Sequence, residues 1–245
     1  MVKQAATAAS ISKALAAFAS PAKSFDQARY FKTEKGGYGD GDRFLGVTVG
    51  QTRIVAKEFQ TLQVGELQKL AKSKWHEERL CALFILTTQF EKSKDAALRE
   101  SHFATWLDWL NRGYINNWDL VDVSAPRMGA QLVGKKSGLV LLRKLAKSQN
   151  LWQRRAAVIL TFAYIRAGSF AESLELCERL VDDKHDLMNK AVGWVLREVG
   201  NRDVAALQAF LGEHAATMPR TALRYAIEKR PEAERRRWLA AKNYN

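Results

Sequence analysis

Arg79-Leu-Cys-Ala-Leu-Phe-Ile-Leu86 is the stretch that decides the fold. Its apolar side chains recur at three- and four-residue spacing, which is typical of a buried helix and not of an alternating strand. The same spacing returns in Ala156, Ile159, Leu160 and Ala163, in Leu174, Cys177 and Leu180, and in Val192, Val195, Leu196 and Val199. Alternating runs rich in Val, Ile and Thr are nearly absent, and Val47-Thr48-Val49 is the one short candidate for a strand. The sequence therefore predicts an all-α fold.

A weak internal repeat accompanies these helices. Segments that open with a cation and continue into an apolar helix begin at Arg79, Arg155, Lys190 and Arg220, with offsets of 76, 35 and 30 residues. The first offset is two units of 38, and a spacing in the thirties is typical of HEAT or armadillo helical hairpins. We expect one solenoid domain over residues 1–245, with 1–20 as a capping or less ordered helix. The repeated cations are expected to line a basic concave surface.

Composition indicates an anionic partner. The 245 residues carry a net charge of +13, and residues 1–35 and 220–245 hold six and eight Lys or Arg against two and three acids. This excess favours nucleic acid ahead of an anionic membrane surface. Cys81 and Cys177 lie far apart in apolar segments, as small core residues of a reducing compartment do. No apolar run is long enough to span a membrane, so we expect a cytoplasmic, nucleoid-associated protein.

Two glycine-rich segments resemble ligand-binding motifs but lack their context. Gly36-Gly-Tyr-Gly-Asp-Gly-Asp42 could cradle a phosphate or bind calcium, yet it has neither a preceding strand nor EF-hand ligand spacing, and a mobile loop is the simpler interpretation. Gly129-Ala-Gln-Leu-Val-Gly-Lys-Lys136 fails as a Walker A motif because Lys136 stands where Ser or Thr must hold magnesium. The histidines are scattered, at His76, His102, His185 and His214. This pattern supports neither a zinc hydrolase nor a Ser-His-Asp triad, and we expect no metal and no cofactor.

Asn117-Trp-Asp-Leu-Val-Asp122 holds two carboxylates three residues apart in an apolar, helix-compatible run. If the run is helical, Trp118 and Asp122 are i and i+4 and project from one face. An aromatic ring beside a partly shielded carboxylate suits a cation, or a transition state that becomes cationic.

Two later segments repeat the pairing of an aromatic ring with a cation. Trp152 and Arg155 are i and i+3, and Trp194 and Arg197 come one repeat later. One interpretation makes the tryptophans core residues between repeats and Arg155 the partner of a carboxylate. The other brings these residues to adjacent repeats with Asp122, where Trp152, Arg155 and Arg197 would bind DNA.

Five blocks occur in a characteristic order: Gln27–Lys32, Arg43–Val47, Asn117–Asp122, Leu151–Ala157 and Asn189–Glu198. Together they resemble the AlkD family of bacterial DNA alkylation-repair glycosylases, from about residue 25 to 230. The resemblance implies a single-domain HEAT-like solenoid that excises N3- and N7-alkylated purines without metal or cofactor.

The resemblance also implies roles for individual residues. Asp122 matches the catalytic carboxylate, and Trp118 and Trp194 match the aromatics that hold the backbone of the damaged nucleotide. Arg155 matches an arginine that contacts phosphate near the lesion, and Tyr30 matches an aromatic at the edge of the cleft. All five residues are present.

We therefore expect a monofunctional DNA glycosylase that acts as a monomer on double-stranded DNA carrying cationic alkylpurines, without base flipping. Asp122 would stabilise the oxocarbenium-like sugar and orient water. The alternatives are a non-catalytic DNA-binding repeat protein that recognises distorted duplex, and a scaffold for acidic proteins. The Gly36–Asp42 loop departs from the family pattern and leaves the cleft shape open. Arg235-Arg-Arg-Trp238 is either a clamp on the DNA backbone or a solvated helix end.

Overall fold

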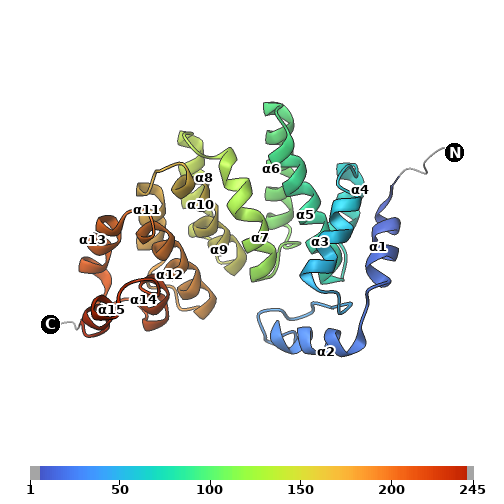
Figure 1. Ribbon diagram of the computed structural model, residues 1–245. Coiled ribbons are helices and arrows are strands. Elements are labelled where there is room, and N and C mark those ends of the chain that lie inside the picture. The colour runs from blue at the N-terminus through green and yellow to red at the C-terminus, as the bar shows by residue number, and fades with distance from the viewer. Residues whose placement is uncertain (1–5, 242–245) are drawn as a thin grey trace. The chain divides into compact units, whose positions relative to one another are not determined.

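The computed structural model describes residues 6–241, and helices are the regular secondary structure of this range (Figure 1). Within it no strand forms: Val47-Thr48-Val49 leads directly into a helix that begins at Val49, and one isolated bridge joins Arg43 to Trp75. The all-α prediction is confirmed. The part of the expected N-terminal cap at residues 1–5 lies outside the described range. No helix within that range is both long and apolar enough to cross a membrane.

The chain divides into two compact units, residues 1–124 and 125–245. The first contains α1 (Ala8–Ala16), α2 (Pro21–Tyr30), α3 (Val49–Glu58), α4 (Val64–Ala71), α5 (His76–Lys92), α6 (Ala96–Asn111) and the start of α7 (Trp118–Met128). The second contains the end of α7, η1 (Gly129–Gln131), α8 (Lys136–Ala146), α9 (Leu151–Leu160), α10 (Phe162–Arg166), α11 (Ala171–Leu180), α12 (Asp186–Gly200), α13 (Val204–His214), α14 (Arg220–Ala226) and α15 (Glu232–Leu239). Because the boundary falls inside one helix, the expectation of a single domain stays a prediction.

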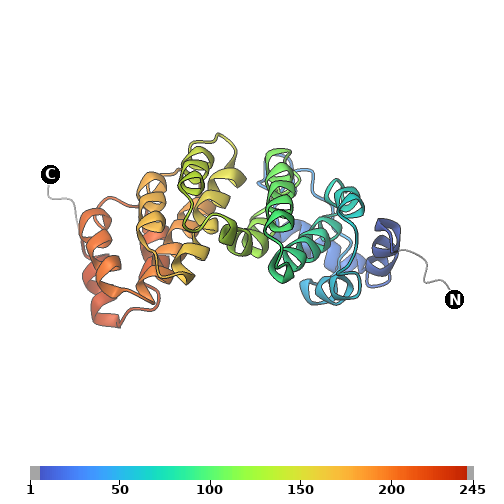
Figure 2. The ribbon, with the colours of Figure 1, turned by 90° about the horizontal axis from the view of Figure 1, so that it is seen from above.

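Helix α5 forms the core of the first unit. It contains the stretch Arg79–Leu86, and every side chain of that stretch is buried. Helices α3, α4 and α6 pack against α5 and lie beside it in both ribbon views (Figures 1 and 2). A helix enclosed by neighbours needs apolar residues all round its surface, which explains the unbroken apolar run.

One buried carboxylate holds the connector between α2 and α3. Glu77 of α5 accepts hydrogen bonds from the backbone N–H groups of Leu45, Gly46 and Val47 at 2.9–3.1 Å. Buried amides need such partners, and three that converge on one anion satisfy the requirement together. Gly46 has a φ of 84°, and a Cβ there would lie 2.0 Å from the carbonyl oxygen of Ser20, so only glycine fits.

Helix α2 docks through polar bonds, because none of its residues is buried. Ser20 caps its first turn ahead of Pro21, a combination typical of helix starts. Ser24 Oγ donates to the carbonyl of Phe44 at 2.8 Å, and Gln27 Nε2 donates to that of Val47 at 3.0 Å. The connector thus positions the end of α2, where Tyr30 lies.

The second unit is organised around α12. Its periodic apolar residues are buried, and α9, α11, α13 and α14 pack against it. At Gly193 a Cβ would lie 2.4 Å from the carbonyl oxygen of Ala222 and 2.5 Å from Cβ of Tyr225. The glycine therefore allows the close approach of α12 and α14.

The repeated cations do not all lie at a surface. Arg79 is 6% and Arg155 5% exposed. Arg79 donates to Asp42 at 2.5 Å, and Arg155 donates to the carbonyl of Leu187. The expectation that each repeated cation lines a surface is wrong for these two, since a buried guanidinium is retained only where it is hydrogen-bonded by protein groups.

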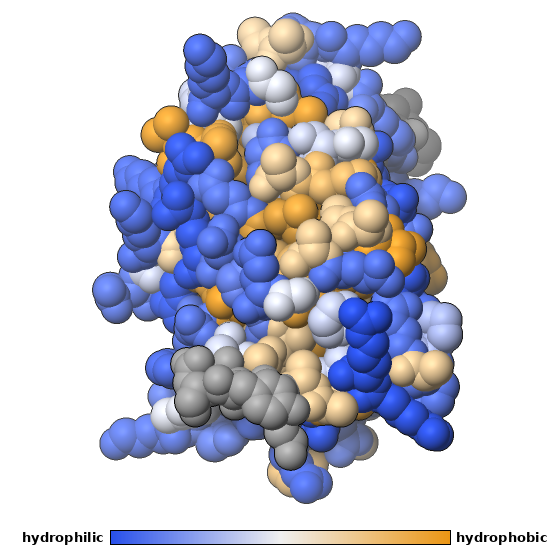
Figure 3. All heavy atoms as spheres, turned by 90° about the vertical axis from the view of Figure 1, so that its left-hand side faces the viewer, coloured by the Kyte–Doolittle hydropathy of each residue, from blue (hydrophilic) through white to orange (hydrophobic). Residues whose placement is uncertain are grey.

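The basic run near the C-terminus belongs to helix α15. Arg235 and Arg236 pair with Glu232 at 3.2 and 2.9 Å, and Arg237 lies 4.9 Å from the ring centre of the buried Trp238. Hydrophilic side chains surround a central apolar group on the face at this end of the chain (Figure 3). Removing the run would also remove a core tryptophan, so a truncation would not isolate the arginines.

Candidate active site

Helix α7 begins at Trp118, and two asparagines fix its start. The side chain of the buried Asn117 accepts from the N–H of Trp118 at 2.9 Å and donates to Oδ2 of Asp42 at 3.2 Å. Asn116 donates to Oδ1 of the same carboxylate at 2.9 Å. The first N–H groups of a helix have no partner inside it, so these bonds determine where α7 starts.

The two carboxylates of α7 have different surroundings. Asp119 is buried, whereas Asp122 is partly exposed and interacts with neighbouring protein groups. Trp118 and Asp122 are i and i+4 of this helix, as predicted, and therefore project from the same side. Pro126, one turn further on, lacks the N–H that would bond to the carbonyl of Asp122.

Aromatic rings connect the partly exposed Trp118 to the interior of the first unit. Trp118 stacks on Phe31 at 5.4 Å between ring centres, Phe31 on Phe44 at 4.9 Å, and Phe44 on His76 at 4.6 Å. Tyr30 meets Trp118 edge-on at 6.1 Å and is 65% exposed. The structure thus brings together two residues predicted for the site, Tyr30 and Trp118.

A buried charged network lies beneath the stack. His76 directs Nδ1 to Oδ2 of Asp42 at 3.1 Å and Nε2 to Oδ2 of Asp119 at 2.7 Å. Both ring nitrogens can donate only in the imidazolium form. Burial opposes that charge, but the two carboxylates outweigh it and raise the pKa of His76 to about 9.

Asp42 is the acidic centre of this network. Besides His76 and the two asparagines, it binds Nη2 of Arg79 at 2.5 Å. Burial alone would raise the pKa of Asp42, yet the hydrogen bond from His76 and the charge of Arg79 lower it to about 2. The carboxylate therefore stays ionised at any pH at which the protein is expected to work.

The Gly36–Asp42 loop ends in this network. Tyr38 Oη donates to the carbonyl of Tyr30 at 3.0 Å. At Gly39 a Cβ would lie 2.3 Å from the carbonyl oxygen of Phe31. The interpretation as a mobile loop does not hold for Gly39 and Asp42, because both are buried and packed. Across residues 6–241, no group of three His, Cys, Asp or Glu side chains is arranged to hold a metal ion.

The remaining predicted residues belong to the second unit. Trp194, on α12, is partly exposed, and its ring centre lies 4.7 Å from that of Phe162. Arg197, one turn later, pairs with Glu228. Both side chains are therefore held by neighbours within their own unit, and their roles toward DNA stay predictions.

Trp152 and Arg155, in the first half of α9, are buried. Asn150 caps this helix, and Arg155 reaches the carbonyl of Leu187 in the first turn of α12. The burial of Trp152 favours the packing interpretation for that residue. The contact of Arg155 ties α9 to the helix that carries Trp194, and its expected contact with phosphate stays a prediction.

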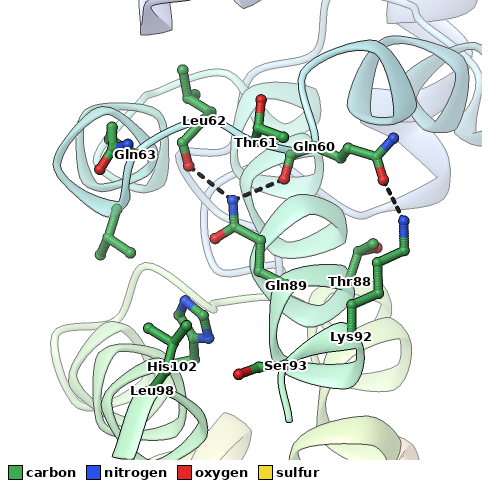
Figure 4. Close-up of a pocket in the computed structure, with 11 residues that line it drawn as sticks. Gln60, Thr61, Leu62, Gln63, Thr88, Gln89, Lys92, Ser93, Leu98 and His102 are labelled. Atoms are coloured by element: carbon green, nitrogen blue, oxygen red, sulfur yellow. Dashed lines mark hydrogen bonds between the residues drawn. The ribbon is translucent and has the colours of Figure 1, made fainter. Parts of the chain in front are cut away.

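A pocket of about 540 Å³ lies at the far end of α5, in the first unit (Figure 4). Gln89 forms part of its wall and donates to the carbonyls of Gln60 and Leu62 at 2.9 and 2.8 Å. His102 and Lys92 also line it, but it has no carboxylate and none of the residues predicted for the site. The volume would suit a small molecule, yet the lining does not offer the chemistry expected of Asp122.

Sequence reasoning missed the Asp42–His76–Asp119 network. These residues are separated by 34 and 43 positions, so no local spacing connects them. The signal that could have indicated it was the pair of carboxylates in Asn117–Asp122, one of which needed a cationic partner once it was buried.

An all-α chain in which a partly exposed carboxylate follows a partly exposed indole by one helical turn defines a helical protein with a candidate site for a developing cation. Residues 11–229 match the DNA alkylation repair enzyme family, and the chain belongs to this family. Its members are enzymes of DNA alkylation repair, so the chain has a role in that process and DNA is its substrate class.

Among solved structures, a predicted DNA alkylation repair enzyme from Enterococcus faecalis superposes with a TM-score of 0.67 at 15% sequence identity. The superposition covers 87% of this chain and 97% of that one. At this identity the likeness shows a shared fold. No match was found among curated proteins.

Proposed function

We propose that this protein is a monofunctional DNA glycosylase that hydrolyses the N-glycosidic bond of cationic N3- and N7-alkylated purines in double-stranded DNA. The observation that carries the proposal is Asp122, a partly exposed carboxylate one helical turn after the anchored Trp118. Membership of the DNA alkylation repair enzyme family supports it. The protein is proposed to act as a monomer.

The chemistry of the substrate explains why one carboxylate suffices. Alkylation at N3 or N7 makes the purine cationic, so it leaves as a neutral base and needs little help from a general acid. The remaining difficulty is the deoxyribose, which gains oxocarbenium character as the bond breaks. A fixed anion beside that sugar lowers the barrier, and the same carboxylate can orient and deprotonate the attacking water.

The other predicted residues have supporting roles in this proposal. On the first unit, the ring face of Trp118 would contact the sugar and favour its developing charge, with Tyr30 at the edge of the site. On the second unit, Trp194 would hold the nucleotide backbone and Arg197 would bind phosphate. Arg155 is buried and hydrogen-bonded to the carbonyl of Leu187, so its proposed contact with phosphate requires that this bond be given up.

Trp152 is buried, so its proposed part in DNA binding is indirect, through the packing of α9. We propose that the target base is not flipped into a pocket, which would restrict the enzyme to lesions that leave without base-specific activation. Neutral lesions such as uracil are therefore expected to be poor substrates.

The decisive experiment incubates the protein with methylated duplex DNA and measures the released bases by chromatography. Wild type should release 7-methylguanine and 3-methyladenine, and uracil from a matched duplex should be released much more slowly. Asp122→Asn should lower the rate by about two decades, or ~3 kcal/mol, the effect of removing one preorganised electrostatic group. Its affinity for undamaged DNA should be nearly unchanged.

Asp108→Asn is the matched control, because it removes a partly exposed carboxylate of α6 that pairs with its helical neighbour Arg112. It should leave base release at the wild-type rate. Salt-sensitive binding without any base release would contradict the proposal and favour the non-catalytic DNA-binding alternative. Comparable release of uracil and 7-methylguanine would contradict the proposed restriction to cationic lesions.

A further inference from the structure

The charged network beneath Trp118 is balanced. Asp42 and Asp119 supply two negative charges, and His76 and Arg79 supply two positive ones. All four side chains are buried. Buried ions persist only where opposite charges and hydrogen bonds compensate them. Removing one member of the network would therefore leave its partner as a buried charge without compensation.

This network binds residues immediately before α7 and in its first turn. Asp42 binds the side chains of Asn116 and Asn117, immediately before the helix. His76 binds Asp119, in its first turn. A single histidine therefore links the loop that ends at Asp42 to the helix that carries the proposed catalytic carboxylate.

Asp119 also lies close to Asp122 along the helix. The two are i and i+3, a spacing at which side chains are neighbours and like charges repel each other. The bond from His76 fixes the side chain of Asp119, and with it the turn of α7 from which Asp122 projects.

We infer that His76 is a positioning residue for the proposed reaction: as a cation between Asp42 and Asp119, it fixes the first turn of α7 and so holds Asp122 in its place one helical turn after Trp118. This inference rests on the proposed function. His76 touches neither substrate nor water in this role and acts through α7.

Charged side chains face His76 from the loop before α3, from α7 and from its own helix. Asp42 faces it from the Gly36–Asp42 loop, Asp119 faces it from α7, and Arg79 lies one turn along its own helix. The rings of Phe31 and Phe44 cover the imidazole at 5.1 and 4.6 Å between ring centres. The raised pKa of His76 agrees with this arrangement.

His76→Gln tests the inference, because glutamine can still donate one hydrogen bond toward Asp119 but carries no charge. We expect its rate of 7-methylguanine release in single turnovers to fall roughly ten- to a hundredfold, the range that small misplacements of a reacting group produce. Its affinity for undamaged duplex should stay at the wild-type value, so the loss should fall on the rate of base release and not on DNA binding.

A second measurement reports the charge of the site without chemistry. Binding is compared for duplexes that contain a neutral tetrahydrofuran or a cationic pyrrolidine in place of the sugar. Wild type should prefer the pyrrolidine, and the preference should shrink in His76→Gln.

Val55→Ala is the control for lost stability, since it removes buried methyl groups of α3 and leaves the network intact. It should not change the preference for pyrrolidine. If His76→Gln slows the reaction with an unchanged preference for pyrrolidine, His76 has only a stabilising role and the inference is overturned.

Hydrogen exchange separates this inference from the proposed function. Amides 117–122 should exchange faster in His76→Gln than in wild type, and should not do so in Val55→Ala. A wild-type protein that releases no base refutes the proposed function and with it the catalytic part of the inference. Unchanged exchange in His76→Gln refutes the positioning part, whether or not base is released.

Discussion

Nε2 of His76 lies 2.7 Å from Oδ2 of Asp119, which joins the first turn of α5 to the first turn of α7. The opposite ring nitrogen faces Asp42 at 3.1 Å, so the imidazole bridges two carboxylates that are far apart in sequence. Because both pairings need a proton on the ring, the stability of the first unit depends on the charge of this histidine.

The stability of the protein should fall as pH rises from 6.5 to about 9. The pKa of His76 is raised in the folded state, so the folded protein holds a proton that the unfolded chain releases near 6.5. The stabilisation is fully present below 6.5 and is lost as pH passes through about 9. Urea unfolding across this window measures it, and His76→Gln should flatten the decline. A free energy of unfolding that stays constant or rises across the window in wild type would contradict this assignment.

On the acid side, the same network should lose stability as pH falls from 3.8 toward 2. The pKa of Asp42 is lowered in the folded state, so its contribution is present above 3.8 and disappears as the carboxylate is protonated. Acid unfolding followed by circular dichroism measures the effect. Asp42→Asn should be less stable than wild type at neutral pH and should approach it near pH 2, whereas a constant difference between the two proteins would count against the network.

Gly39→Ala should destabilise the first unit by about 1–3 kcal/mol, the usual cost of overpacking. The new Cβ would meet the carbonyl oxygen of Phe31 at 2.3 Å and Nδ2 of Asn117 at 3.3 Å. Gly65→Ala is the control, because no atom lies within 4 Å of a Cβ there and the site is in helix α4. It should be stabilising by ~0.5–1 kcal/mol through helix propensity. Chemical denaturation measures the free energy of unfolding of both variants. Equal changes in Gly39→Ala and Gly65→Ala would show that the loop tolerates a side chain at position 39.

Trp118→Ala should lower base release about fivefold, since it removes the ring face proposed to contact the sugar, an interaction worth ~1 kcal/mol. Trp118→Phe keeps a ring on Phe31 and should retain most of the rate. Tyr30→Phe removes only a hydroxyl and should behave as wild type. Single-turnover release assays measure all three. A full rate in Trp118→Ala would exclude the indole from the reaction.

The two thiols should be unreactive in the folded protein. Burial raises the pKa of Cys81 to about 12 and also raises that of Cys177, so almost no thiolate forms at neutral pH. An alkylating reagent should label neither residue in buffer and both in concentrated urea, as mass spectrometry can show. Rapid labelling of Cys177 under native conditions would mean that α11 opens locally.

The helical fold could be predicted because its signal is local. The apolar spacing of Arg79–Leu86 shows burial within a single stretch, and the i, i+4 relation of Trp118 and Asp122 follows from the same periodicity. Arg79 was assigned to a surface because it opens one of the repeated segments, whose cations were expected to line a basic face. Its partner, Asp42, is 37 residues away.

The site could be predicted only where its residues share a helix. Asp122 and Trp118 could be found because they lie in one short run, whereas His76, Asp42 and Asp119 are brought together by packing alone. The loop before Asp42 was interpreted from its glycines, which indicate flexibility. At Gly39 the missing side chain instead permits close contact with Phe31.

The stack from His76 to Trp118 has a consequence for recognition. The stack immobilises the indole of Trp118 while the chain folds, so the ring has little rotational freedom left to lose when a ligand binds. Ligand binding should therefore carry a small entropic penalty at Trp118. A contact surface that is rigid beforehand also selects by shape, because any ligand that would need the ring to turn is rejected.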